Sequence, residues 1–218
     1  MDNARLRGHA HAHMSIYALK PRFQALLRPL VRQLHTAGVT ANQVTVAACV
    51  ISVALALLII AMPQHAWLFV LIPLWFTLRM ALNAIDGMLA REFAQASALG
   101  TILNELGDVI ADAALYLPFA FIAGSNPWLI VLVIVLAMLS EFAGVLGITI
   151  GASRRYDGPM GKSDRAAVFG VMGLLAGLSV PIAPYVNWVW ITVAALTALT
   201  IVNRVRGALK ERNAKGTT

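Results

Sequence analysis

Residues 42–62 read NQVTVAACVISVALALLIIAM, a run of 21 residues that contains no charged side chain. About 20 apolar residues in a helix are enough to cross the ~30 Å of hydrocarbon in a bilayer. Because no water is available there, the backbone must satisfy its own hydrogen bonds, as a helix does. The stretch therefore predicts a transmembrane helix.

The rest of the chain repeats this pattern. Short turns rich in Pro, Gly, Asn and Ser separate five further apolar stretches, at 66–91, 98–122, 127–153, 164–184 and 187–205. Of the 218 residues, 59% are hydrophobic and 12% are charged, with a mean hydropathy of +0.75. That composition leaves too little polar surface for a water-soluble domain. We expect an all-α integral membrane protein with six transmembrane helices.

Both ends of the chain are more polar than its centre. Residues 16–35 alternate apolar with basic side chains, a pattern typical of an amphipathic helix that lies in the headgroup layer. Residues 1–13 are expected to form a flexible extension and residues 211–218 a flexible tail. Residues 14–210 then form one six-helix membrane domain.

The net charge of +7 is distributed unevenly. Lys and Arg collect before the first span, at 154–165 and after the last span, whereas the turns at 62–65, 124–127 and 184–187 contain none. The positive-inside rule then places both termini in the cytoplasm. The basic residues are a topology signal, and no nucleic-acid partner is expected.

Acidic side chains inside spans are costly, so each is a functional candidate. Five acids lie there: Asp86, Glu105, Asp108, Asp112 and Glu141. Helical spacing places Asp86 on one face with Asn83, and Asp108 within an arc of about 100° with Asn104. Oxygen atoms from two adjoining helices suit Mg²⁺ that carries substrate phosphates. The alternative is that these polar groups hold the helices together.

The same stretch carries a longer pattern of residues. It reads Asn83-x2-Asp86-Gly87-x2-Ala90-Arg91-x8-Gly100-x3-Asn104-x3-Asp108. This resembles the signature of the CDP-alcohol phosphotransferases (CDP-alcohol phosphatidyltransferases), Asp-x2-Asp-Gly-x2-Ala-Arg-x8-Gly-x3-Asp-x3-Asp. The spacing is kept throughout, with Asn at the first and third acidic positions. Residues 40–45 and 161–163 also resemble family elements at the starts of the first and fifth spans.

The resemblance implies transfer of a phosphatidyl or phosphoalcohol group from a CDP-alcohol, with CDP-diacylglycerol as the expected donor. A second alcohol, small or phosphorylated, would accept the group with release of CMP, in phospholipid synthesis. The cofactor would be one or two Mg²⁺ or Mn²⁺ ions. A homodimer in the bacterial inner membrane is expected, among membrane lipids, with its active site facing the cytoplasm.

The resemblance also assigns roles to residues. The metal ligands would be Asn83, Asp86, Asn104 and Asp108, and Asp108 would also be the general base. The substrate-binding positions would be Asn42, Gly87, Ala90, Arg91, Ser97 and Gly100.

The two asparagines change what the site can hold, because an amide oxygen brings no negative charge. We expect one metal ion, or two bound weakly. Glu105 and Asp112 flank Asp108 and could restore the missing charge. The alternative function is a catalytically weak or silent relative that binds CDP-lipids. A transporter is less favoured because the acids cluster near one surface.

The acceptor side is less defined. Arg154, Arg155, Lys162 and Arg165 could clamp an acceptor phosphate, or they could be topology charges. Lys162 and Arg165 are assigned to substrate binding because they begin the fifth span. Glu141 is expected to bond Arg79 or to support the polar pocket.

Overall fold

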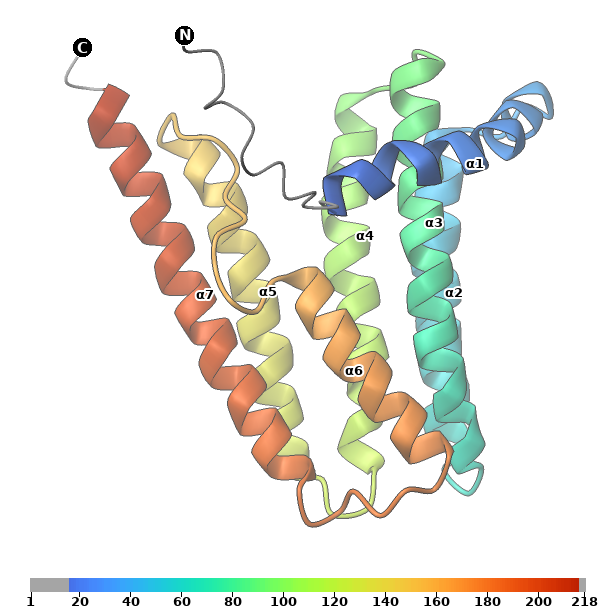
Figure 1. Ribbon diagram of the computed structural model, residues 1–218, viewed down its shortest axis with the longest axis vertical. Helices are drawn as coiled ribbons and strands as arrows, with labels where there is room; N and C mark the ends of the chain where they lie inside the picture. The colour runs from blue at the N-terminus through green and yellow to red at the C-terminus, as the bar shows by residue number, and fades with distance from the viewer. Residues whose placement is uncertain (1–15, 216–218) are drawn as a thin grey trace, which may run out of the picture.

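The computed structural model describes residues 16–215, which form helices and connecting turns without a strand. Figure 1 shows α2 to α7 running alongside one another, with α1 lying across one end of the bundle. In chain order the elements are α1 (Ile16–Thr36), α2 (Ala41–Ala61), η1 (Ala66–Val70), α3 (Leu71–Glu92), α4 (Ala98–Tyr116), η2 (Leu117–Phe121), α5 (Pro127–Thr149), α6 (Lys162–Gly177) and α7 (Val186–Lys215). The expected extension at 1–13 lies outside the described residues.

Four helical segments within the described range are long and apolar enough to cross a membrane: α2, η1 with α3, α5 and α7. The helix α4 is less apolar because Glu105, Asp108 and Asp112 lie along it. The helix α6 has 16 residues, which at 1.5 Å per residue is about 24 Å and shorter than the hydrocarbon layer. An all-α membrane fold is confirmed, and the count of six spans stays a prediction.

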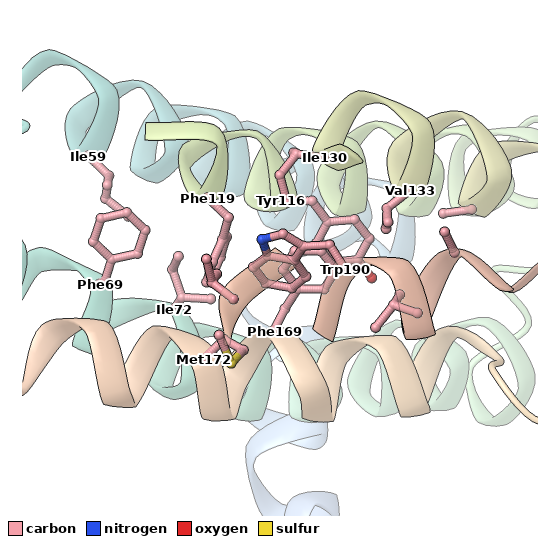
Figure 2. Close-up of a cluster of buried hydrophobic side chains, with 14 of the residues drawn as sticks. Ile59, Phe69, Ile72, Tyr116, Phe119, Ile130, Val133, Phe169, Met172 and Trp190 are labelled. Atoms are coloured by element: carbon pink, nitrogen blue, oxygen red, sulfur yellow. The ribbon is translucent and has the colours of Figure 1, made fainter. Parts of the chain in front are cut away.

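A cluster of aromatic side chains packs α4, α6 and α7 together (Figure 2). The ring of Phe169 on α6 stacks on Tyr116 of α4 at a centroid distance of 3.9 Å and on Trp190 of α7 at 4.9 Å. All three side chains are fully buried. Large buried rings contribute strongly to core packing, so this stack fixes α6 against its neighbours.

The segment between α5 and α6 turns back along the bundle, so α6 begins well below the end of α5 (Figure 1). Small residues on α5 permit this: a Cβ on Gly144 or Gly147 would lie 2.8 Å from the carbonyl oxygen of Arg155 or Ser153, respectively. The backbone N–H of Met160 donates to Thr200 Oγ1 on α7 at 2.9 Å. The helices therefore end at Thr149 and begin at Lys162, instead of forming the predicted spans 127–153 and 164–184.

The last helix is longer than the sequence predicted. Residues 211–215, expected as part of a flexible tail, continue α7. Glu211 holds them by accepting hydrogen bonds from the backbone and hydroxyl of Ser153 and from Arg155. These contacts join residues 56 to 58 positions apart, which no local pattern reveals. Residues 216–218 lie outside the described part of the chain, and the domain limits remain predictions.

The interfacial helix α1 packs against the end of α3. Val31 is buried there with Met88 and Leu89 of α3. The guanidinium of Arg28 donates two hydrogen bonds to the carboxylate of Glu92, at 3.1 and 2.9 Å. The apolar contact and the bidentate pair place α1 over the α3–α4 turn, at the end of the bundle where α7 also finishes (Figure 1).

Candidate active site

One cavity of about 350 Å³ lies among α2, α3 and α4, close to the α3–α4 turn. All four polar positions of the signature line it, two from each of α3 and α4. The lining residues are Ala41, Asn42, Thr45, Asn83, Asp86, Gly87, Ala90, Arg91, Gln95, Ala96, Ser97, Gly100, Thr101, Asn104 and Asp108. The spacing on two neighbouring helices thus does bring these side chains to one place.

The start of α2 is fixed by local hydrogen bonds. Thr40 caps the helix by accepting from the backbone N–H of Gln43, and the Gln43 side chain accepts from Thr40 N–H. This capping box sets where α2 begins. The helix then presents Asn42 and Thr45 to the cavity.

Asp86 is the more buried of the two signature carboxylates, with 7% of the residue exposed. Thr45 Oγ1 donates to Asp86 Oδ2 at 2.8 Å. A hydrogen bond to an ionised carboxylate is stronger than one between neutral groups. It therefore helps to fix the orientation of the Asp86 carboxylate.

Asp108 lies between two cations. Arg79 Nη2 lies 3.1 Å from Asp108 Oδ1, and Lys162 at the first residue of α6 forms an ion pair with Oδ2. Asn83 Nδ2 donates to Oδ1 at 3.5 Å. Arg79 itself is 4% exposed and also pairs with Asp112 at 2.7 Å. The side chains of α3, α4 and α6 therefore meet at Asp108.

A second cavity, of about 550 Å³, lies between α3 and α6 and shares Asn83 with the first. Its polar end is formed by Arg79, Asp112, Lys162 and Ser163. The rest is apolar, and Met80 and Val171 on its wall are 60% and 58% exposed. This cavity is a groove that begins beside the signature residues and continues along exposed apolar side chains.

The predicted substrate-binding positions lie in three places: the first cavity, the groove, and outside both. Six of them line the first cavity: Asn42, Gly87, Ala90, Arg91, Ser97 and Gly100. Lys162 lines the groove and reaches Asp108. Arg165 lines neither cavity, because its guanidinium is buried against Glu141, Ser140 and the carbonyl oxygen of Met160.

The two proposed auxiliary acids do not join the signature cavity. Glu105 is paired with Arg154, and Asp112 is paired with Arg79. Glu141 pairs with Arg165 at 2.8 Å and not with Arg79. Each acid is neutralised by an arginine from another helix or loop, so the expected restoration of charge around Asp108 does not occur.

Several lining residues were not singled out from the sequence. Gln95 accepts a hydrogen bond from the backbone N–H of Ala41 at 2.7 Å and lines the cavity between α3 and α4. Thr101 follows Gly100 on α4. Thr45 could have been found, because it lies three residues after Asn42 and so shares its helical face.

The donor atoms of the signature are compatible with one divalent ion. They comprise two carboxylates and two side-chain amides, which offer the oxygen ligands that Mg²⁺ prefers. Among the described residues no group of three or more Asp, Glu, His or Cys is arranged to hold a metal. Two carboxylates suffice where substrate phosphates supply further ligands.

A helical membrane bundle with carboxylate and amide oxygens facing a cavity near its end is compatible with a membrane enzyme acting on a phosphate-bearing substrate. Residues 38–202 match the family description CDP-alcohol phosphatidyltransferase. The chain is also similar to Inner membrane protein YnbA of Escherichia coli (strain K12), at 46% identity over 196 residues, covering 90% of this chain and 97% of that protein. The chain belongs to the CDP-alcohol phosphatidyltransferase family.

Solved structures share the fold. The phosphatidylinositol phosphate synthase PgsA1 of Mycobacterium tuberculosis with CDP-DAG bound has a TM-score of 0.67 and 20% identity, covering 83% of this chain and 92% of that one. Its complex with manganese and citrate gives the same TM-score and identity, with coverage of 83% and 88%.

Family membership states the activity in general terms. The chain is a CDP-alcohol phosphotransferase of phospholipid synthesis, which moves a phosphoalcohol group from a CDP-alcohol to a second alcohol. The similarity to an inner membrane protein and the apolar helices identify it as a multi-pass protein of a bacterial inner membrane.

Proposed function

We propose that this chain transfers the phosphatidyl group of CDP-diacylglycerol to a second alcohol and releases CMP. One observation carries the proposal: Asp86 and Asp108 line a single cavity together with Asn42, Arg91 and Ser97. Carboxylates, a guanidinium and a helix N-cap in one place suit a nucleotide diphosphate.

The groove between α3 and α6 supports a lipid donor. It meets the signature cavity at Asn83 and runs along apolar side chains such as Phe76 and Leu174. A CDP-linked lipid needs a polar site for its nucleotide next to an apolar surface for its acyl chains. The CDP-DAG complex of PgsA1 gives independent support for this donor.

The residues that would hold a divalent ion are Asp86 and Asp108, with the amide oxygens of Asn83 and Asn104. We propose one ion, Mg²⁺ or Mn²⁺, because the signature offers two negative charges where the family pattern has four. When bound, such an ion offsets the negative charge of the diphosphate. The manganese complex of PgsA1 supports the class of cofactor.

Asp108 is proposed as the general base. The acceptor hydroxyl loses its proton to the Asp108 carboxylate, and its oxygen forms a bond to the β-phosphorus of the donor. The bond from that phosphorus to the bridging oxygen breaks, and CMP leaves with the electron pair. Arg79 and Lys162 hold the carboxylate in position from both sides.

A catalytically silent relative is the second candidate. Asn83 and Asn104 favour it, because they remove two charges from the metal site. The ion pair between Lys162 and Asp108 also favours it, because Lys162 occupies an oxygen that a base or ligand would use. Such a protein would bind CDP-lipids without turnover.

Purified protein with CDP-diacylglycerol, Mg²⁺ or Mn²⁺ and a panel of alcohols tests the proposal. We expect metal-dependent release of CMP that falls at least 100-fold in Asp108→Asn, within the range that general bases contribute. Asp157→Asn is the matched control, because Asp157 lies on the α5–α6 segment and lines neither cavity. Nucleotide binding without CMP release under every acceptor would favour the silent relative.

A further inference from the structure

The segment leading into α6 carries two arginines that are each already paired with acids. Arg154 forms an ion pair with Glu105 and lies 3.7 Å from Glu141. Arg155 donates to Asp157 at 2.7 Å and to Glu211 at 2.8 Å. Hydrogen bonds from Arg155 lower the pKa of the Asp157 carboxyl, which keeps that partner charged.

Arg165, which begins α6 with Lys162, cannot reach a substrate. It is 1% exposed, and its Nη2 lies 2.8 Å from Glu141 Oε1. The cavity that it lines with Glu141 and Asp112 measures about 10 Å³, close to the space that one water molecule needs. A phosphate group does not fit there.

Lys162 does line the groove, opposite Asp108. Lys162 and Arg79 are two cations that face the carboxylates of Asp108 and Asp112. The polar end of the groove is thus balanced before a metal ion or substrate binds. Among the described residues that line the two cavities, Arg91 is the cation without an ion pair, and it lies on the nucleotide side.

From this charge balance we propose that the acceptor is an uncharged alcohol and not a phosphomonoester. The inference rests on the proposed function and adds the class of acceptor to it. A phosphate carries about 1.5 to 2 negative charges near pH 7 and would approach a site that already holds the donor's diphosphate. To clamp it, the protein would have to break a partly buried ion pair and leave an acid unpaired.

An uncharged alcohol finds suitable partners at the same place. The hydroxyl of Ser163 and the amide of Asn83 line the groove beside Asp108. These groups donate and accept hydrogen bonds without requiring a charge on the ligand. An uncharged acceptor can therefore be held beside Asp108 by hydrogen bonds alone.

Matched acceptor pairs test the proposal directly. CMP release from CDP-diacylglycerol is measured with glycerol against glycerol 3-phosphate, and with inositol against inositol 1-phosphate. We expect kcat/KM to be at least ten-fold higher for the uncharged member of whichever pair is accepted. Equal or faster reaction with the phosphorylated member overturns the proposal while leaving the proposed function intact. If no member of either pair raises CMP release above the acceptor-free rate, both the proposed acceptor class and the proposed function are overturned.

A variant that removes the nearer of the two acids beside Arg154 provides a second measurement. Glu105→Gln removes the acid paired with Arg154 next to signature position Asn104, so the preference for the uncharged acceptor should shrink at least three-fold. Glu211→Gln is the control, because it removes one acid partner of Arg155, which lines neither cavity and keeps its pair with Asp157, and its preference should match the unmodified protein. A preference unchanged by Glu105→Gln overturns the proposed role of the ion pairs.

Discussion

Lys162, the first residue of α6, forms an ion pair with Asp108 in the middle of α4. The contact exists because the chain between α5 and α6 turns back into the bundle before α6 begins. The proposed general base is therefore contacted by a helix that begins more than 50 residues further along the chain.

Replacing this lysine should damage turnover. Lys162→Met keeps most of the apolar side chain and removes the charge, so Asp108 loses one of its two cations. We expect kcat to fall about ten-fold or more, because a carboxylate held by one cation instead of two is less well positioned for the reaction. Lys210→Met, at an exposed position on α7, should leave kcat unchanged. A Lys162→Met enzyme with normal kcat would show that this pair does not position the base.

Removing the hydroxyl that orients Asp86 should weaken metal use. Thr45→Val keeps the shape of the side chain and removes the 2.8 Å hydrogen bond to Asp86. Hydrogen bonds to charged groups contribute about 1.5–3 kcal/mol, so the Mg²⁺ concentration for half-maximal CMP release should rise about ten-fold or more. Thr192→Val, whose hydroxyl bonds only its own helix at Trp188, is the control. Identical metal dependence in both variants would contradict the assignment of Asp86 as a ligand.

Two glycines on α4 allow a matched test of the nucleotide site. A Cβ on Gly100 would lie 2.7 Å from Asn42 Oδ1 and 3.1 Å from Ser97 Oγ, whereas a Cβ on Gly107 would meet nothing closer than 3.7 Å. Gly100→Ala must therefore shift the Asn42 side chain. We expect the KM for the CDP-alcohol to rise at least five-fold in Gly100→Ala and to stay within two-fold in Gly107→Ala. A normal KM in Gly100→Ala would remove Asn42 from the nucleotide site.

The stability of the folded protein should depend on one acid, which pairs with two buried arginines on α6 and α7. Arg165 and Arg204 are 1% and 2% exposed, and both pair with Glu141. Removing one partner of a buried pair is destabilising by about 3–5 kcal/mol. Glu141→Leu should therefore lower the Tm in detergent by several degrees or more, whereas Glu92→Leu, at the exposed end of α3, should change it little. Equal Tm values for the two variants would contradict a structural role for Glu141.

The sequence predicted the features that depend on local spacing. Hydropathy located the helices, and the three- and four-residue spacing of Asn83, Asp86, Asn104 and Asp108 correctly brought these residues to one cavity. Both inferences use only the geometry of a single helix and the short turn between two neighbours. The match to the family signature added the substrate class.

The features that depend on packing between distant segments were not predictable in the same way. Arg165 begins α6 beside Lys162, yet the two point to different acids. The start of α6 is set by the contacts of Gly144, Gly147 and Thr200 with the α5–α6 segment. The presence of small residues in the sequence does not predict these contacts. The sequence also favoured Glu105 as an added source of negative charge. Its pairing with Arg154 was not predicted, because the two residues are 49 positions apart.

The proposed reaction depends on side-chain oxygens of α3 and α4 holding one divalent ion together with a CDP-linked lipid. Titration of Mn²⁺ into the purified protein with CDP-diacylglycerol, followed by electron paramagnetic resonance, measures this without relying on turnover. We predict one bound Mn²⁺ per chain, lost in Asp86→Asn and in Asp108→Asn and retained in Asp157→Asn. Mn²⁺ that fails to bind, or that binds equally well when Asp86 and Asp108 are replaced, would contradict the account.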